Sequence, residues 1–318
     1  MKASARAQPN IALVKYWGKR DLARNLPAVS SLSVTLEDLW TKTSVSFEDQ
    51  PADTLTVNDQ DAPLMLERVS RCLDLVAGPN RPKARIRSKG NFPIGAGLAS
   101  SASAFAALVV AADGAAGTGH DRLALARLAG AASGSAARSL YGGIVELSAG
   151  EDQIDLQQLA GRQDWPLEVI VAVTEAGQKA VGSGAAMIRS ADTSPFYSRW
   201  LEQQEDDMGV ARAAVGNRDF AQLAAVAEHN CLKMHSVMWS SRPPIVYWNS
   251  ATLACMETIR SLQDDGHAVF FTIDAGPQLK AVCLPESAGA VEKALGQTAG
   301  VTDLMRTGLG AGAGLLES

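Results

Sequence analysis

Hydrophobic and polar positions form short runs over the first fifty residues of the chain. The runs IALVKYW, SLSVTL and KTSVSF alternate or cluster β-branched and apolar residues between turn formers, which is typical of strands. Residues 84–92 alternate small or apolar residues with basic ones and lead into the glycine-rich stretch NFPIGAGLASS. An alanine-rich apolar stretch, Ala104 to Ala112, follows. The pattern predicts a β-rich start and then a strand, a loop and a helix.

A change of pattern near the middle of the chain suggests two domains. The helical pattern continues over 122–132 and is interrupted by the small residues of SGSAARSLYGG. Residues 151–165 are polar and irregular, and the strand-like run PLEVIVAV follows them. We therefore predict a domain boundary there, with domains at 1–165 and 166–318.

The second part of the chain is predicted to alternate helices and strands. Residues 196–238 and 250–263 have helical patterns. The second of these helices has one predicted apolar edge, formed by Leu253, Met256, Ile259 and Leu262. The segment AVFFTIDAGPQLKAVCL indicates a strand, an Asp-Ala-Gly-Pro turn and another strand.

Composition and charge narrow the kind of ligand. The 318 residues are 47% hydrophobic and 20% charged, which is typical of a soluble globular protein. A net charge of −5 and the lack of a basic run argue against nucleic-acid binding, so a small molecule is the expected ligand. The longest apolar run, Ala104 to Ala112, is far below the roughly 20 residues of a membrane span. The N-terminal stretch also lacks the apolar core of a secretory signal.

Cysteines and histidines give no metal or disulfide pattern. Four of each are scattered along the chain without pairing or ligand spacing. We expect reduced thiols in a cytoplasmic protein and no dedicated transition-metal site.

The glycine-rich stretch leaves two interpretations open on its residues alone. Gly95 and Gly97 permit close backbone approach, and Ser100, Ser101 and Ser103 fall where the next helix should begin. The first amides of a helix suit phosphate, yet an ordinary capped turn has the same residues. Neither the dinucleotide fingerprint nor the P-loop motif is complete. A nucleotide site here would therefore belong to another fold.

Several segments together resemble one enzyme family. NIALVKYWGKRD (10–21), the loop of 91–108 with SGSAARSLYGG after it, and FTIDAGP (271–277) occur in the order and separation seen in mevalonate diphosphate decarboxylases. NLPAVSSLSVTL, EHNCLKMHSV and PPIVYWN strengthen the resemblance, which covers nearly the full chain. The family is part of the group of galacto-, homoserine, mevalonate and phosphomevalonate kinases.

The resemblance implies both fold and reaction. The expected fold is α+β, a two-domain small-molecule-kinase fold with an N-terminal domain like ribosomal protein S5 and a C-terminal ferredoxin-like domain. The active site would lie in the cleft, and the protein would be a homodimer. ATP and Mg²⁺ are the implied cofactors. The implied reaction, in the mevalonate route of isoprenoid biosynthesis, converts 5-diphosphomevalonate to isopentenyl diphosphate, ADP, phosphate and CO₂.

Three residues carry the implied chemistry. Asp274 would orient or deprotonate the 3-hydroxyl group, and Lys15 would be the cation beside it. Arg138 would hold the substrate carboxylate that departs as CO₂. Each also has a structural interpretation: a turn cap for Asp274, a solvated lysine for Lys15 and an ion pair for Arg138.

Further positions follow from the same alignment with the family. The substrate diphosphate is assigned to Tyr16, Lys19, Ser133, Ser135, Ser183 and Met187, with Arg20 as a looser candidate. The ATP phosphates are assigned to Pro93, Gly95, Gly97, Leu98, Ala99, Ser100 and Ser101. Ser101 is also the candidate metal ligand. The segment VGSGAAM departs from the family pattern, because Gly184 stands where a hydroxyl side chain is common.

Three other functions remain open on the sequence. The chain could decarboxylate 5-phosphomevalonate, or phosphorylate the 3-hydroxyl of mevalonate without decarboxylation. From a different class, it could be a catalytically silent homologue that binds a small molecule.

Overall fold

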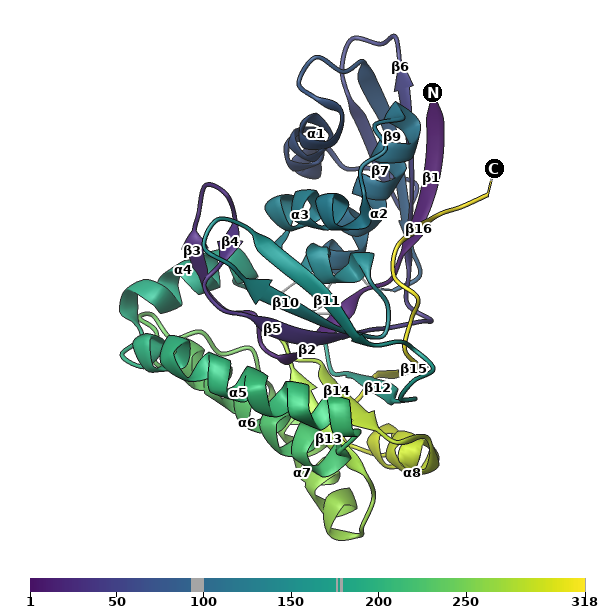
Figure 1. Cartoon of the computed structure of the whole chain (residues 1–318). Helices are drawn as coiled ribbons and strands as arrows, with labels where there is room; N and C mark the ends of the chain where they lie inside the picture. Colours follow the sequence, from purple (N-terminus) through teal and green to yellow (C-terminus); the bar gives the residue numbers. More distant parts are fainter. Residues whose placement is uncertain (93–99, 176, 178–179, 318) are drawn as a thin grey trace.

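The computed structural model describes residues 1–92, 100–175, 177 and 180–317. These residues form an α+β fold with two domains, as the resemblance implied (Figure 1). The chain ends lie near each other at one side of the first domain, because the last segment returns to pair with the first strand.

The first sheet packs against α2 (Ser100–Ala116), the helix that begins at the end of the candidate phosphate loop. Its spatial order is β16-β1-β6-β9-β7-β8. The strands are β1 (Lys2–Ala7), β6 (Thr41–Glu48), β7 (Thr54–Val57), β8 (Gln60–Asp61), β9 (Lys83–Gly90) and β16 (Gly314–Leu315). Helices α1 (Pro63–Ala77) and α2 pack against this sheet, and α3 (Arg122–Ala132) packs against these two helices.

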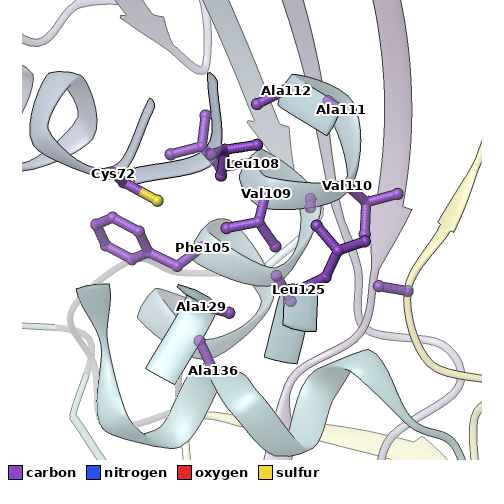
Figure 2. Close-up of a cluster of buried hydrophobic side chains, with 14 of the residues drawn as sticks. Cys72, Phe105, Leu108, Val109, Val110, Ala111, Ala112, Leu125, Ala129 and Ala136 are labelled. Atoms are coloured by element: carbon purple, nitrogen blue, oxygen red, sulfur yellow. The ribbon is translucent and has the colours of Figure 1, made fainter. Parts of the chain in front are cut away.

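Helix α2 forms the centre of this domain's core. Small side chains such as Ala106 and Ala107 are fully buried in this core. Ala111 and Ala112 are fully buried in the same cluster (Figure 2). Alanines allow the helix to approach the sheet closely, while Phe105 and Leu108 fill the space towards α1. The predicted succession of strand, loop and helix is confirmed at its two ends by β9 and α2.

The second sheet, a two-stranded ribbon and a short 3₁₀ helix carry parts of the candidate site. Its order is β11-β10-β5-β2, from β2 (Asn10–Val14), β5 (Ser31–Thr35), β10 (Ile144–Ala149) and β11 (Ile154–Ala160). A two-stranded ribbon, β3 (Lys19–Asp21) with β4 (Leu26–Pro27), follows β2. The small residues of SGSAARSLYGG form a short 3₁₀ helix, η1 (Gly134–Leu140).

The third sheet belongs to the second domain, in the order β13-β14-β12-β15. Its strands are β12 (Glu168–Val173), β13 (Val269–Ile273), β14 (Leu279–Cys283) and β15 (Asp303–Thr307). The helices of this domain are α4 (Ser183–Thr193), α5 (Tyr197–Asn217), α6 (Phe220–Trp239), α7 (Ser250–Asp264) and α8 (Pro285–Gly296). Among the described helices, none has both the length and the apolar character that crossing a bilayer requires.

Two helix predictions need correction. The run 196–238 is two helices, because Arg218 adopts a left-handed φ of 54° and Asp219 then caps α6 through the amide of Gln222. The predicted apolar edge of α7 is also partly wrong. Leu253 is half-exposed, and the buried face instead contains Cys255 together with Ile259 and Leu262.

A shared core joins the second and third sheets. Leu13 and Val34 from β2 and β5 pack in one cluster with Val171 and Phe270 from β12 and β13. Helices α5 and α6 contribute to the same cluster. This packing places the end of β2 beside the end of β13, where two of the predicted site residues follow.

Candidate active site

Lys15 and Asp274 meet where the two domains join. Lys15 directly follows β2 and Asp274 directly follows β13, and Lys15 Nζ lies 2.7 Å from Asp274 Oδ1. Lys15 Nζ also donates to the carbonyl oxygen of Ala12 at 2.9 Å. The lysine side chain is 1% exposed and the aspartate side chain 24%. The lysine is therefore a buried cation, and the carboxylate keeps one open side.

A second lysine completes this cluster. Lys280 lies in β14, opposite Thr272 of β13, and its Nζ is 3.3 Å from Asp274 Oδ2. Its side chain is fully buried. Burial by itself would raise the pKa of Asp274, but the ammonium groups of Lys15 and Lys280 outweigh that effect and hold the pKa below its usual range. Asp274 is thus an ionised, weakly basic carboxylate at neutral pH.

Arg138 is a buried cation with neutral partners. It belongs to η1, is 2% exposed, and donates to Asn10 Oδ1 at 3.2 and 3.3 Å, to Ser33 Oγ at 3.0 Å and to Ser31 Oγ at 2.6 Å. Burial lowers its pKa to about 10, so the guanidinium stays charged at neutral pH. Within the described chain, no carboxylate forms a salt bridge with it. Such an uncompensated charge favours an anionic ligand.

Tyr16 lies beside this arginine. The Arg138 guanidinium is 5.8 Å from the centre of the Tyr16 ring, and burial raises the tyrosine pKa to about 12. The phenol hydroxyl is buried, and none of the described groups forms a hydrogen bond with it. A buried, neutral hydroxyl facing the cavity can donate to or accept from a ligand.

Two further cations lie at one part of the cavity. Burial lowers the pKa of Lys19 in β3, and the positive charge of Arg68 in α1 lowers it further. Arg68 donates through Nε and Nη2 to the carbonyl oxygen of Ala132, at 3.1 and 2.8 Å, and its guanidinium lies over the Phe105 ring. Two neighbouring cations suit a ligand group with several negative charges.

The remaining predicted substrate residues come from two helix starts and one core position. Ser133 precedes η1 and Ser135 lies in its first turn, while Ser183 is the first residue of α4. Met187, on α4, is 7% exposed and packs with Trp17. Helix N-termini carry partial positive charge, so these serines lie where an anion is stabilised.

The candidate phosphate loop is described only at its end. Ser100 and Ser101 form the first turn of α2, and Ser101 is exposed. The predicted positions Pro93, Gly95, Gly97, Leu98 and Ala99 lie outside the described residues.

One cavity of about 770 Å³ brings these groups together. The predicted site residues that line it are Lys15, Tyr16, Lys19, Ser100, Ser101, Ser133, Ser135, Arg138, Ser183, Met187 and Asp274. In the described part of its lining, four side chains are cationic and Asp274 alone is anionic. The volume and charge suit polyanionic small molecules. Arg20 does not line the cavity, since it donates to the carbonyl oxygens of Gly150 and Glu151.

The described residues contain no group of three His, Cys, Asp or Glu side chains that could hold a metal ion. Near the start of α2, the described protein groups that could bind a metal ion are hydroxyl oxygens such as that of Ser101. This donor set fits a magnesium ion that is coordinated mainly by phosphate oxygens and water.

Sequence reasoning missed Lys280, Arg68 and Asn10. A lone lysine in the apolar run QLKAVCL was a usable signal for Lys280. Arg68 lies on a helix that Pro63 and the apolar spacing of Val69, Leu73 and Val76 could have predicted. No sequence signal indicates Asn10, because its contact with Arg138 arises only in the folded chain.

Comparison with known proteins assigns the family. Residues 7–159 match the diphosphomevalonate decarboxylase-like N-terminal domain, and residues 169–306 match the mevalonate 5-diphosphate decarboxylase C-terminal domain. The diphosphomevalonate decarboxylase of Eremothecium gossypii is 37% identical over 310 residues, covering 90% of this chain and 78% of that protein.

Solved structures agree with this match. The mevalonate diphosphate decarboxylase of Staphylococcus aureus is 34% identical, with a TM-score of 0.93 over 99% of this chain and 98% of that one. A structure described as "MDDEF in complex with MVAPP, AMPPCP and Magnesium" is 33% identical, with a TM-score of 0.93 over 100% and 99% of the two chains. With both domain models matched and the cavity residues in place, the chain belongs to the diphosphomevalonate decarboxylase family.

Proposed function

We propose that this protein decarboxylates 5-diphosphomevalonate with ATP to give isopentenyl diphosphate, ADP, phosphate and CO₂. The observation that carries the proposal is Arg138, a buried guanidinium with neutral partners in the cavity that contains Lys15 and Asp274. Transfer of a phosphoryl group alone needs no clamp for a carboxylate. A reaction that expels the carboxyl group as CO₂ needs one, because the clamp orients the bond that breaks.

In the first step, the C3 hydroxyl oxygen forms a bond to the γ-phosphorus of ATP, and the bond between that phosphorus and ADP breaks. Asp274 accepts a hydrogen bond from the hydroxyl group, orients its oxygen, and takes up the hydroxyl proton late, when the O–P bond has largely formed. Because the two lysines hold the pKa of Asp274 low, orientation of the hydroxyl is favoured over early proton abstraction. Lys15 contributes positive charge where negative charge moves.

In the second step, the C3–O bond breaks and phosphate departs. The electron pair of the C1–C2 bond becomes the second bond between C2 and C3, and C1 leaves as CO₂. Arg138 holds the C1 carboxylate in line for this step, and Asn10, Ser31 and Ser33 hold the guanidinium in turn. These contacts leave the arginine little freedom to follow a misplaced substrate.

We assign the diphosphate to the cavity region of Lys19, together with Arg68, which the sequence did not indicate. Tyr16, Ser133, Ser135, Ser183 and Met187 complete this assignment. Gly184 lines the same cavity, and a Cβ atom there would meet nothing within 4 Å, so the position has room for a side chain but, as glycine, offers no hydroxyl group to the phosphates. The charge of the two neighbouring cations supports a diphosphate over a monophosphate.

The ATP phosphates are assigned to the loop before α2 and to Ser100 and Ser101, with Mg²⁺ at Ser101. Support comes from the helix start that faces the cavity and from the related structure described with AMPPCP and magnesium. Magnesium would neutralise charge on the phosphates, while the chain's own amides and hydroxyls position them. A domain boundary near residue 165, a homodimer and a cytoplasmic location stay predictions.

The test compares two substrates. Purified protein with ATP and Mg²⁺ is given either 5-diphosphomevalonate or 5-phosphomevalonate, and ADP and CO₂ are measured separately. We expect equal amounts of ADP and CO₂ and a higher kcat/KM for the diphosphate. ADP without CO₂ would indicate a 3-kinase, a preference for the monophosphate would reassign the substrate, and no turnover would indicate a silent homologue.

A further inference from the structure

The backbone of Lys15 is held by side chains of the other domain. Lys15 lies just beyond β2, where strand pairing ends. Its N–H donates to Asn230 Oδ1 at 2.7 Å, and its carbonyl oxygen accepts from Gln204 Nε2, also at 2.7 Å. Both backbone groups of this residue are thus satisfied by fully or almost fully buried amide side chains from α6 and α5.

A second set of contacts fixes the orientation of the Asn230 amide. Its Nδ2 donates to Asp207 Oδ2 at 2.6 Å and to Gln204 Oε1 at 3.0 Å. An ionised carboxylate can only accept hydrogen bonds, so Nδ2 must face Asp207 and Oδ1 must face Lys15. Lys233 Nζ lies 2.5 Å from the same Asp207 oxygen, which keeps that carboxylate paired.

The second domain also binds the backbone at Trp17, two residues after Lys15. Trp200 of α5 donates through Nε1 to the carbonyl oxygen of Trp17 at 3.0 Å. Residues 15–17 are therefore bound at three backbone atoms by the second domain, and this segment carries Lys15 and Tyr16 into the cavity.

We propose that Asn230, oriented by Asp207 and assisted by Gln204, is a positioning residue for Lys15 and, through it, for Asp274. This inference rests on the proposed function, since Lys15 acts there as the cation beside the reacting hydroxyl. Asn230 touches neither substrate nor the reacting atoms. Its effect is to fix the backbone from which the Lys15 side chain reaches Asp274, and an error of about 1 Å in such a group can lower a rate about 10²-fold.

The variant Asn230→Asp tests the proposal with little change in shape. Its second oxygen cannot donate to Asp207, and two carboxylates then face each other. We expect kcat to fall about tenfold or more with little change in KM for ATP or substrate. The double variant with Asp207→Asn restores a donor, an acceptor and the net charge, so we expect it to recover most of the lost kcat.

A control variant separates positioning from general loss of stability. Gln263 of α7 is a comparable amide that donates to Glu228 Oε1 at 3.0 Å and to the carbonyl oxygen of Val269 at 2.8 Å, outside the cavity lining. Gln263→Leu should alter stability and leave kcat at the wild-type value. If Asn230→Asp fails to fold, Gln204→Met replaces it, with the same fall in kcat expected.

Hydrogen exchange distinguishes this proposal from the proposed function. In Asn230→Asp, or in Gln204→Met, amide exchange over residues 10–19 should become about tenfold faster, whereas Gln263→Leu should leave that segment unchanged. This readout holds whether or not the wild type releases CO₂, which alone tests the function. Any one of three results would overturn the proposal. These are unchanged amide exchange over residues 10–19, an unchanged kcat in a folded variant that replaces Asn230 or Gln204, and a double variant whose kcat is no higher than that of Asn230→Asp.

Discussion

Lys15 Nζ lies 2.7 Å from Asp274 Oδ1, although 259 residues separate the two in the chain. One residue follows the second strand of the first domain and the other follows a strand of the second domain. The pair forms only when the shared core brings those strand ends together. Packing between the domains is therefore part of what builds the proposed site.

The second lysine should set the acidity of Asp274. In Lys280→Met, the carboxylate loses one of two cations, so its pKa should rise towards or above the ordinary value of 3.8. Asp274 would then be protonated at a higher pH, so the acid limb of the pH profile of kcat should move to higher pH. The profile is measured over the pH range in which each variant remains folded. Lys89→Met, at an exposed lysine, is the control, and a limb in the same position for all three proteins would argue against the role of Lys280.

Loss of the carboxylate clamp should separate phosphorylation from decarboxylation. In Arg138→Gln, we expect CO₂ release to fall more than ADP release, so that a phosphorylated intermediate accumulates. Single-turnover measurement of both products checks this expectation. Arg122→Gln is a matched control, because Arg122 also donates to a neutral oxygen, that of Leu140, and does not line the cavity. Equal maximal rates of ADP and CO₂ release at the wild-type value would refute the clamp.

Loss of Lys19 should act on substrate binding. Lys19→Met removes one of two neighbouring cations, so KM should rise with little change in kcat, and the rise should be larger for the diphosphate than for the monophosphate. Arg20→Met is the control, since Arg20 is adjacent in the chain and faces away from the cavity lining. If Lys19→Met affects both substrates equally, the assignment of the diphosphate to Lys19 is wrong.

Burial of His235 should make stability depend on pH. This fully buried histidine packs against Trp248 with the two rings tilted, and burial lowers its pKa from 6.5 to about 3. Between those values the unfolded chain binds a proton that the folded chain does not, so stability is lost as pH falls below 6.5. From pH 7.5 to 5.5 this group alone should lower the free energy of unfolding by about 1 kcal/mol. Denaturant unfolding of wild type and His235→Phe at both pH values measures it, and an identical pH dependence in the two proteins would contradict the assignment.

The sequence indicated the parts of the site that lie in short motifs. Lys15, Arg138 and Asp274 each belong to a segment that resembles the family, and all three line one cavity. Lys280 could not be paired with Asp274 from sequence, because the contact depends on how β14 folds back on β13. Asn230 lies in EHNCLKMHSV, one of the segments that resemble the family, but its contact with the Lys15 backbone depends on packing between the domains.

Secondary structure was predictable where the pattern was strong. The runs that became β5, β6 and α3 have clear alternation or helical spacing. The break at Arg218 did have a signal in the sequence: Gly216 and Asn217 are typical of a helix end, and Asp219 stands three residues before Gln222, which is typical of a helix start. The hydrogen bond from the Gln222 amide to Asp219 confirms that start.

The most direct test of the account follows the carboxyl carbon. Diphosphomevalonate labelled at C1 is incubated with ATP, Mg²⁺ and either the wild type or Asp274→Asn, and labelled CO₂, ADP and isopentenyl diphosphate are measured. The account predicts one CO₂ and one isopentenyl diphosphate for each ADP in the wild type. It also predicts a loss of about 10²-fold or more in the variant, with substrate binding nearly retained. ADP formed without labelled CO₂ by the wild type, or near wild-type turnover by Asp274→Asn, would contradict it.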